Sequence, residues 1–264
     1  MRLQTLISTM NQIDYDLLEK MNINCDSIVV NQCQESSESV FLHESCQITW
    51  INSKDTGLSK SRNLALSKAT ADICLLADDD LEYIRNYKEI ILKQFEMYPK
   101  ADIIAFQVEG IERMFKRYSK HRKNINCINL MKISSVEIAF RRERINEKKV
   151  MFNELFGAGS KYQMGEESIF LSNCIRNGLN IMYVPIKIAN LHIGESSWFR
   201  GFNKQYFINK GAAFAAMNPK LDLLFIIQFA IRKHKIYKEN LSLINVMRLM
   251  INGRNMYIGD NIDD

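Results

Sequence analysis

The chain has 264 residues, of which 47% are hydrophobic and 25% charged, and its formal net charge is +5. These proportions are typical of a globular protein and exclude a disordered or fibrous chain. The length predicts one large domain or two small ones, with a core that needs no disulfide or structural metal. The mild positive charge suits an anionic ligand or an anionic membrane surface, and we expect no nucleic-acid partner.

The first half of the chain alternates between short apolar runs and helical patterns. The predicted strands cover residues 3–8, 27–30, 48–51, 73–76 and 102–108, and the predicted helices cover residues 14–21, 59–69 and 84–98. Strands that alternate with helices indicate βαβ units and a mostly parallel sheet. Ligands bind such sheets outside the carboxyl ends of the strands, so we expect the functional residues in the loops there.

The second half is less regular. Its patterns predict a solvated basic run at 116–123, a strand at 135–140, a helix at 166–177 that ends at Gly178, and a strand at 181–184 that ends at Pro185. The last sixty residues have helical spacing.

The cysteines and the apolar segments bear on the compartment. No two of the six cysteines have CxxC spacing, which favours free, reduced thiols. Residues 1–9 lack the apolar run of a signal peptide, and the longest apolar stretch, residues 221–231, is too short to span a bilayer. We therefore expect a cytoplasmic protein.

Three consecutive carboxylates, Asp78, Asp79 and Asp80, directly follow the strand predicted at 73–76. Their mutual repulsion costs stability unless a cation relieves it. Mg²⁺ or Mn²⁺ is suited to this, since it binds one or two carboxylates together with substrate phosphates. A solvated turn or a helix cap is the alternative.

Other segments carry weaker signals. Gly57, Lys60 and Arg62 begin a predicted helix, and they favour phosphate unless they simply cap an ordinary helix. Glu166 and Glu167 begin another helix, where one carboxylate could act as a general base or both could serve as helix caps.

Two smaller features complete the candidate set. Glycines around Gly159 would allow a ligand to approach the backbone closely, although a plain loop explains them too. His192 is either a metal ligand or a structural histidine.

Six segments in this order resemble glycosyltransferase family 2, which comprises inverting enzymes with the GT-A fold. They are STMN at 8–11, VVN at 29–31, GLSKSRN at 57–63, LADDD at 76–80, FNELFGAG at 152–159 and GEESIF at 165–170. The resemblance covers about residues 1–215. It implies an α/β fold with a Rossmann-like, mostly parallel sheet flanked by helices, followed by a C-terminal helical extension over residues 216–264.

The resemblance also implies roles for the matching residues. The nucleotide-sugar donor would contact Thr9, Asn11, Asn31, Gly57, Lys60, Arg62, Asn63, Asp78, Asp79 and Gly159. Asp80 would bind Mn²⁺ or Mg²⁺ with Asp78 and with His192, which is followed by GESS at 194–197. Glu167 would be the catalytic base, with Glu166 beside it.

The implied function is a metal-dependent inverting transfer of a sugar from a nucleotide-sugar, a UDP-sugar by preference. The acceptor would be a hydroxyl of a glycan or a lipid-linked acceptor in surface polysaccharide biosynthesis. One alternative is a sugar-phosphate nucleotidyltransferase, although the glycine-rich basic loop expected after its first strand is missing. Another is a non-catalytic nucleotide-sugar-binding subunit. The presence of both the aspartate cluster at 78–80 and the glutamate pair at 166–167 argues against it.

The apolar run at 221–231 is followed by a basic cluster at 232–235. Such a helix can lie in a membrane interface, here the inner leaflet at the cytoplasmic face. Alternatively, it packs on the core or at a contact between subunits of a homo-oligomer. The net positive charge is expected to lie in this cluster and around Lys60 and Arg62.

Overall fold

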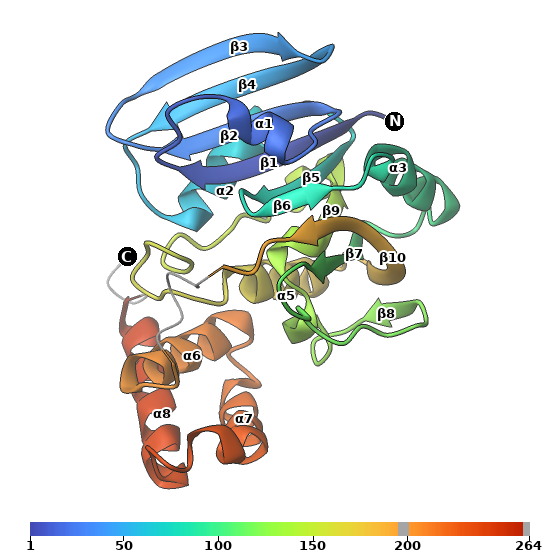
Figure 1. The fold of residues 1–264 in the computed structure, drawn as a ribbon. Helices are drawn as coiled ribbons and strands as arrows, with labels where there is room; N and C mark the ends of the chain where they lie inside the picture. Colours follow the sequence, from blue (N-terminus) through green and yellow to red (C-terminus); the bar gives the residue numbers. More distant parts are fainter. Residues whose placement is uncertain (195–200, 261–264) are drawn as a thin grey trace.

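A computed structural model describes residues 1–194 and 201–260 (Figure 1). Residues 195–197 of the segment after His192 therefore lie outside the described residues. The strands are β1 (Leu3–Met10), β2 (Asp26–Gln32), β3 (Ser37–His43), β4 (Cys46–Ser53), β5 (Ile73–Asp78), β6 (Leu81–Tyr83), β7 (Ile103–Gly110), β8 (Lys123–Ile125), β9 (Ile138–Arg141) and β10 (Ile181–Leu191). The helices are α1 (Asp16–Lys20), α2 (Leu58–Lys68), α3 (Tyr87–Met97), α4 (Arg142–Glu147), α5 (Glu166–Arg176), α6 (Lys204–Met217), α7 (Asp222–Tyr237) and α8 (Leu243–Asp260).

The strands form one sheet in the order β3-β4-β2-β1-β5-β9-β7-β10-β6, with β8 also paired to β10. The strands β4, β2, β1 and β5 are parallel to one another, as are β7 and β10. Between these two groups β9 is antiparallel to both neighbours. The expected mostly parallel α/β sheet is thus confirmed.

Helices cover both faces of this sheet because successive strand residues point to opposite sides. Leu6 and Leu76 pack in one apolar cluster with residues of α2, α5 and all three C-terminal helices. Their chain neighbours Ile7 and Leu75 pack in a second cluster with α1 and α3. Because α6 to α8 share the first cluster, they are built onto the core of the sheet. The boundary expected at residue 215 falls inside α6.

The sequence prediction differs from the structure in several elements. Residues 135–137 form a 3₁₀ turn, and the strand predicted at 135–140 begins at Ile138. Pro185 does not end its strand, since β10 continues to Leu191. The pairing of β10 with β7 shifts register between Tyr183 and Ala189, and this irregularity accommodates a residue without a backbone N–H.

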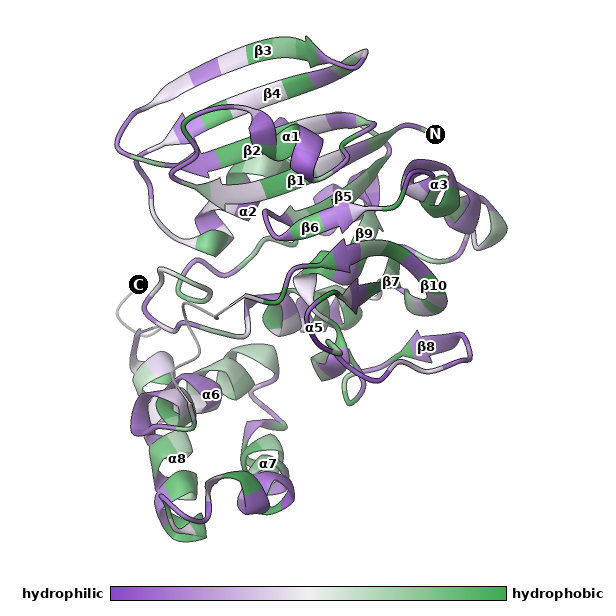
Figure 2. Ribbon diagram, viewed as in Figure 1, coloured by the Kyte–Doolittle hydropathy of each residue, from purple (hydrophilic) through white to green (hydrophobic). Residues whose placement is uncertain are grey.

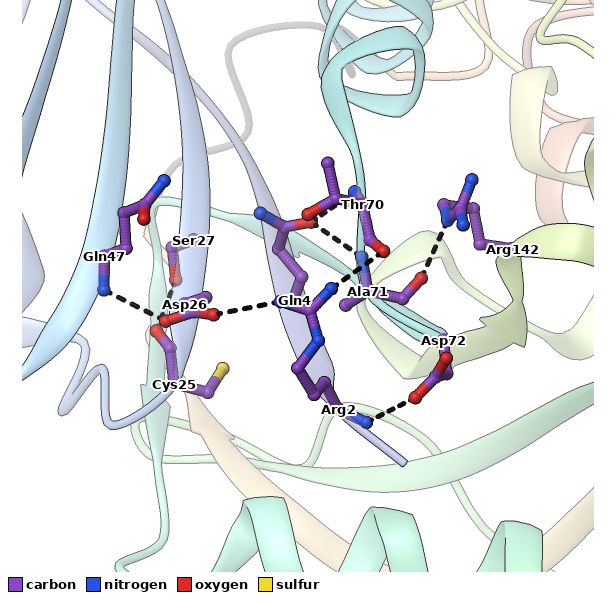
Figure 3. A network of polar contacts seen from close by, with 10 residues as sticks. All are labelled: Arg2, Gln4, Cys25, Asp26, Ser27, Gln47, Thr70, Ala71, Asp72 and Arg142. Atoms are coloured by element: carbon purple, nitrogen blue, oxygen red, sulfur yellow. Dashed lines mark hydrogen bonds and ion pairs between the residues drawn. The ribbon is translucent and has the colours of Figure 1, made fainter.

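A network of polar contacts connects the amino ends of β1 and β5 with neighbouring segments (Figure 3). The backbone N–H of Arg2 donates to Asp72 at 2.7 Å, and its guanidinium donates to the carbonyl of Thr70 at 3.1 Å. Arg142 donates to the carbonyl of Ala71 at 2.8 Å. These groups tie β1, β5 and α4 together at the edge of the sheet opposite the one that carries Asp78.

The C-terminal helices cross closely. A Cβ on Gly211 of α6 would lie 1.9 Å from the carbonyl oxygen of Met250, and a Cβ on Gly253 of α8 would lie 1.9 Å from that of Ile208. The two backbones can approach this far only because both positions are glycine. Among the residues that the structure describes, no helix is long and apolar enough to cross a membrane.

Candidate functional site

Two adjoining cavities open at the carboxyl ends of β1 and β5. The larger one, of about 730 Å³, is lined by the predicted residues Thr9, Gly57, Asp78, Asp79 and Gly159. The second, of about 320 Å³, is lined by the predicted residues Asp78, Asp80, Glu166 and Glu167. Asp78 lies on the wall of both, so the structure brings these eight residues together around one cleft.

The three aspartates diverge as β5 ends. Asp78 is the last residue of β5, and Asp79 accepts a hydrogen bond of 2.5 Å from the hydroxyl of Thr9. Asp80 remains accessible to solvent. Desolvation in the cleft, and then the neighbouring Asp78 and Asp79, raise the pKa of Asp80 to about 7. A nearby cation would therefore stabilise the charged form of Asp80.

Arg62 links two carboxylates that line the cavities, Asp78 and Glu166. Its residue is only 1% exposed, and its guanidinium donates to Asp78 at 2.9 Å and to Glu166 at 3.1 Å. It also lies 5.6 Å from the centre of the Phe152 ring. Because both hydrogen-bonded partners are carboxylates, the positive charge of Arg62 is neutralised within the protein, and the two ion pairs fix Asp78 and Glu166 in place. Arg62 is not a free anion-binding group.

Glu167 lies at the start of α5, where Gly165 adopts a φ of +91°. Burial, followed by the neighbouring Glu166, raises the pKa of Glu167 to about 8. The charges of Arg62 and Lys210 act in the opposite direction. A carboxylate with a pKa near neutrality, beside a cavity, has the properties of a general base.

Lys210 is a site residue that the sequence analysis did not identify. It comes from α6 and lines the second cavity with Glu167, close enough for their charges to interact. Its ammonium group lies 5.4 Å from the ring centre of Phe214, and burial lowers its pKa. No local motif marks Lys210, because only the docking of α6 brings it to the cleft.

The glycine segments pack against each other at the mouth of the larger cavity. Leu58 donates its N–H to the carbonyl of Ala158 at 2.9 Å, and Gly57 donates to the side chain of Gln32 at 2.8 Å. A Cβ on Gly159, whose φ is +77°, would lie 3.3 Å from the backbone of Gly57. Gly57 and Gly159 therefore allow their two loops to pack closely. Because neither has a side chain, backbone atoms form this part of the cavity wall.

Four predicted donor-binding residues occupy other positions. Asn31 is buried, and its amide bonds to both backbone groups of Gln12 and to Asn52. It thus fixes the loop after β1, in which Asn11 has a φ of +55°. Lys60 and Asn63 line a separate cavity of about 380 Å³ on the other side of α2.

His192 lies next to Asp80, because its N–H donates to the Asp80 carbonyl at 2.8 Å. Its imidazole instead contacts Glu112, with 3.2 Å between Nδ1 and Oε1. Within residues 1–194 and 201–260, no three His, Cys, Asp or Glu side chains are grouped closely enough to hold a metal by themselves. The described residues alone therefore do not complete the ligands of a cation here.

The end of α8 holds the loop that carries Gly159. Asp260 accepts hydrogen bonds from Lys161 at 2.5 Å and from Tyr162 at 2.7 Å. Tyr257 packs edge-on against Phe156 with 5.2 Å between ring centres. The C-terminal extension therefore shapes the cleft in two ways: α6 lines both cavities, and α8 holds the loop that carries Gly159.

Comparison with known proteins gives one matching family and several solved structures of similar fold. Residues 5–170 match the family model described as glycosyl transferase family 2. A search of curated proteins gives no match. Among solved structures, S. aureus TarS 1–349 in complex with UDP-GlcNAc matches with a TM-score of 0.69 and 13% identity, covering 98% of this chain and 81% of that one. The mannosyltransferase PcManGT from Pyrobaculum calidifontis, in complex with GDP-Man and Mn²⁺, matches with a TM-score of 0.53 and 12% identity, covering 96% and 73%.

Proposed function

Because the chain belongs to glycosyltransferase family 2, we propose that it transfers a sugar from a UDP-sugar to an acceptor hydroxyl, with inversion and with the help of a divalent cation. The observation that carries this proposal is the pair of adjoining cavities that meet at Asp78. One has room for a nucleotide-sugar, and the other holds a carboxylate suited to act as a base. The structures of TarS in complex with UDP-GlcNAc and with UDP support the choice of donor.

In this proposal the donor occupies the larger cavity, and Gly57 and Gly159 leave room for it beside the backbone. Asp78 and Asp79 lie on the ribose or sugar side. The hydroxyl of Thr9 orients Asp79 through their hydrogen bond. The acceptor enters the second cavity, where Lys210 lies on the wall with Glu167.

The charge of the cleft favours a cation. Among the described residues that line the two cavities, Lys210 is the cation facing five carboxylates, Asp78, Asp79, Asp80, Glu166 and Glu167. A diphosphate would be repelled by this cleft unless positive charge came with it. Asp80 would hold Mg²⁺ or Mn²⁺, with phosphate oxygens of the donor completing its ligands. When bound, the ion would neutralise the charge of the departing diphosphate.

The base in the proposed reaction is Glu167. Its carboxylate takes the proton of the acceptor hydroxyl, whose oxygen then bonds to the anomeric carbon of the donor. The bond from that carbon to the phosphate oxygen breaks, and its electrons leave with the diphosphate. Attack from the face opposite the leaving group inverts the configuration. Glu166 is not the base in this proposal, because its carboxylate pairs with Arg62 at 3.1 Å.

The test is release of UDP from a panel of UDP-sugars, with an acceptor glycan, in the presence of Mn²⁺ or of a chelator. Glu167→Gln should lower kcat by about 10²–10⁴-fold and leave donor binding intact, because only proton removal is lost. Asp80→Asn should abolish the effect of Mn²⁺ on donor affinity. Glu96→Gln, at an exposed position on the opposite face of the sheet, is the matched control and should change neither quantity.

Two results would contradict the proposal. Full turnover by the Glu167 variant would exclude Glu167 as the base, and donor binding that a chelator does not affect would exclude the cation.

The acceptor that we favour is a glycan, free or carried on a lipid, in the assembly of a surface polysaccharide. The nucleotidyltransferase alternative is disfavoured by the family match, and a binding subunit without activity is disfavoured by the position of both Asp80 and Glu167 on the wall of one cavity.

A further inference from the structure

Helix α7 is apolar on two opposite sides. Its inner side, which includes Phe225, Ile226 and Phe229, is buried in the core. Its outer side exposes Leu223, Leu224, Ile227 and Ile231, which are 48%, 60%, 43% and 61% exposed. Their spacing places them along one face of the helix. A continuous apolar strip of this kind on a surface marks a contact site.

The end of α7 adds positive charge to this strip. Arg232 and Lys235 in its last turns, and Lys238 just after it, are exposed. The acidic residue at the start of the helix does not offset them, since Asp222 is buried and bonded to Arg254 at 2.6 Å. Figure 2 shows apolar residues along α7 and polar ones toward its end. Glu239, directly after Lys238, is also exposed and offsets one of these charges, so the outer face is apolar and carries a net positive charge.

We propose that this face of α7 docks on the surface of an anionic lipid bilayer. Apolar side chains would enter the boundary between headgroups and acyl chains, while the cations would contact the lipid phosphates. A second copy of the chain suits this face less well, since it would bring the same cations. The contact would be peripheral, because no described helix can cross a membrane.

The position of α7 lets this contact coexist with an open cleft. Figure 1 shows α7 at the end of the molecule opposite β3. The helix packs on α6, which contributes Lys210 to the second cavity. A membrane at α7 would therefore lie on the side of the molecule where α6 forms the wall of the cleft. The inference does not depend on the proposed transfer reaction, because lipid binding needs neither donor nor acceptor.

The test is flotation of the full chain with phosphatidylcholine vesicles, with and without phosphatidylglycerol. We expect binding to the anionic vesicles and weaker binding at high salt. The pair Leu224→Gln and Ile231→Gln should weaken binding on the order of tenfold, because two apolar anchors are lost. The pair Arg232→Gln and Lys235→Gln should weaken it similarly and reduce the salt dependence.

The matched control is Val40→Thr with Leu42→Gln, which replaces two exposed apolar residues on β3 at the far edge of the sheet. This variant should float like the unaltered chain. Circular dichroism and the melting temperature show whether each variant is folded. Absence of flotation with anionic vesicles, or equal flotation of all folded variants, would overturn the proposal. It would also be overturned if the Leu224 and Ile231 pair abolished a dimer seen by light scattering, since the face would then belong to a second copy.

Discussion

The crossing of α6 and α8 offers the sharpest test of how the C-terminal helices are held. Gly253→Ala would place a methyl group 1.9 Å from the carbonyl oxygen of Ile208. Real Cβ atoms essentially never approach a heavy atom closer than 3.0 Å. The opposing atom is backbone and cannot rotate away, so the two helices must separate by about 1 Å or bend.

The cost follows from what that separation disturbs. Overpacking a well-packed contact costs roughly 1–3 kcal/mol, and alanine's better helix propensity returns about 1 kcal/mol. We expect Gly253→Ala to lower the free energy of unfolding by up to about 2 kcal/mol. Gly259→Ala in the same helix is the control, because a Cβ there meets no atom within 4 Å. That variant should leave stability unchanged or raise it by a few tenths of a kcal/mol.

Urea unfolding followed by far-UV circular dichroism measures both variants. Gly211→Ala makes the reciprocal contact with Met250. Once the helices have separated for one methyl group, the second fits at lower cost, so the double variant should lose less than the two single losses combined. Equal stability of the Gly253 and Gly259 variants would refute the close crossing.

Three further predictions concern the site. Arg62→Met should lower the free energy of unfolding by about 3–5 kcal/mol in urea titrations, because it leaves two partly buried carboxylates unpaired; a loss below about 1 kcal/mol would contradict this. Without divalent cations the melting temperature should fall as pH rises from about 4.5 to 8, since the raised pKa values of Asp80 and Glu167 mean that the folded state binds more protons than the unfolded state in that range. Glu167→Gln should flatten this dependence, and an unchanged slope would count against the raised pKa. Asp260→Asn should raise the donor KM about fivefold with little change in kcat, because it weakens the bonds that hold Tyr162 and its loop; an unchanged KM would contradict that role.

The sequence predicted those parts of the fold that depend on local pattern. The buried parallel strand β5 is a short, continuous apolar run, and the aspartates after residues 73–76 marked the carboxyl edge correctly. The edge strand β3 was missed because its side chains are mostly exposed and show no alternation. Pro185 was misread because a bulge in a sheet depends on the partner strand, which the local sequence does not specify.

Residues that act through distant contacts were harder to assign. Asn31 and Asn63 stand in segments of the family pattern, but their amides bond to backbone groups of other loops. Those partners lie 19 and 89 residues away along the chain. Lys210 was missed for the same reason, since its place in the cleft is set by how α6 packs.

The net charge of +5 illustrates how composition can indicate a ligand but not its site. Lys60 faces a different cavity from Gly57, and the charge of Arg62 is taken up by two carboxylates. The lining of the cleft is therefore acidic although the chain is basic. The exposed cations among the described residues lie elsewhere, including those at the end of α7. In the proposed function an anionic donor would be attracted by an ion that it shares with Asp80. Donor affinity measured in the presence of a chelator therefore tests the proposed chemistry most directly.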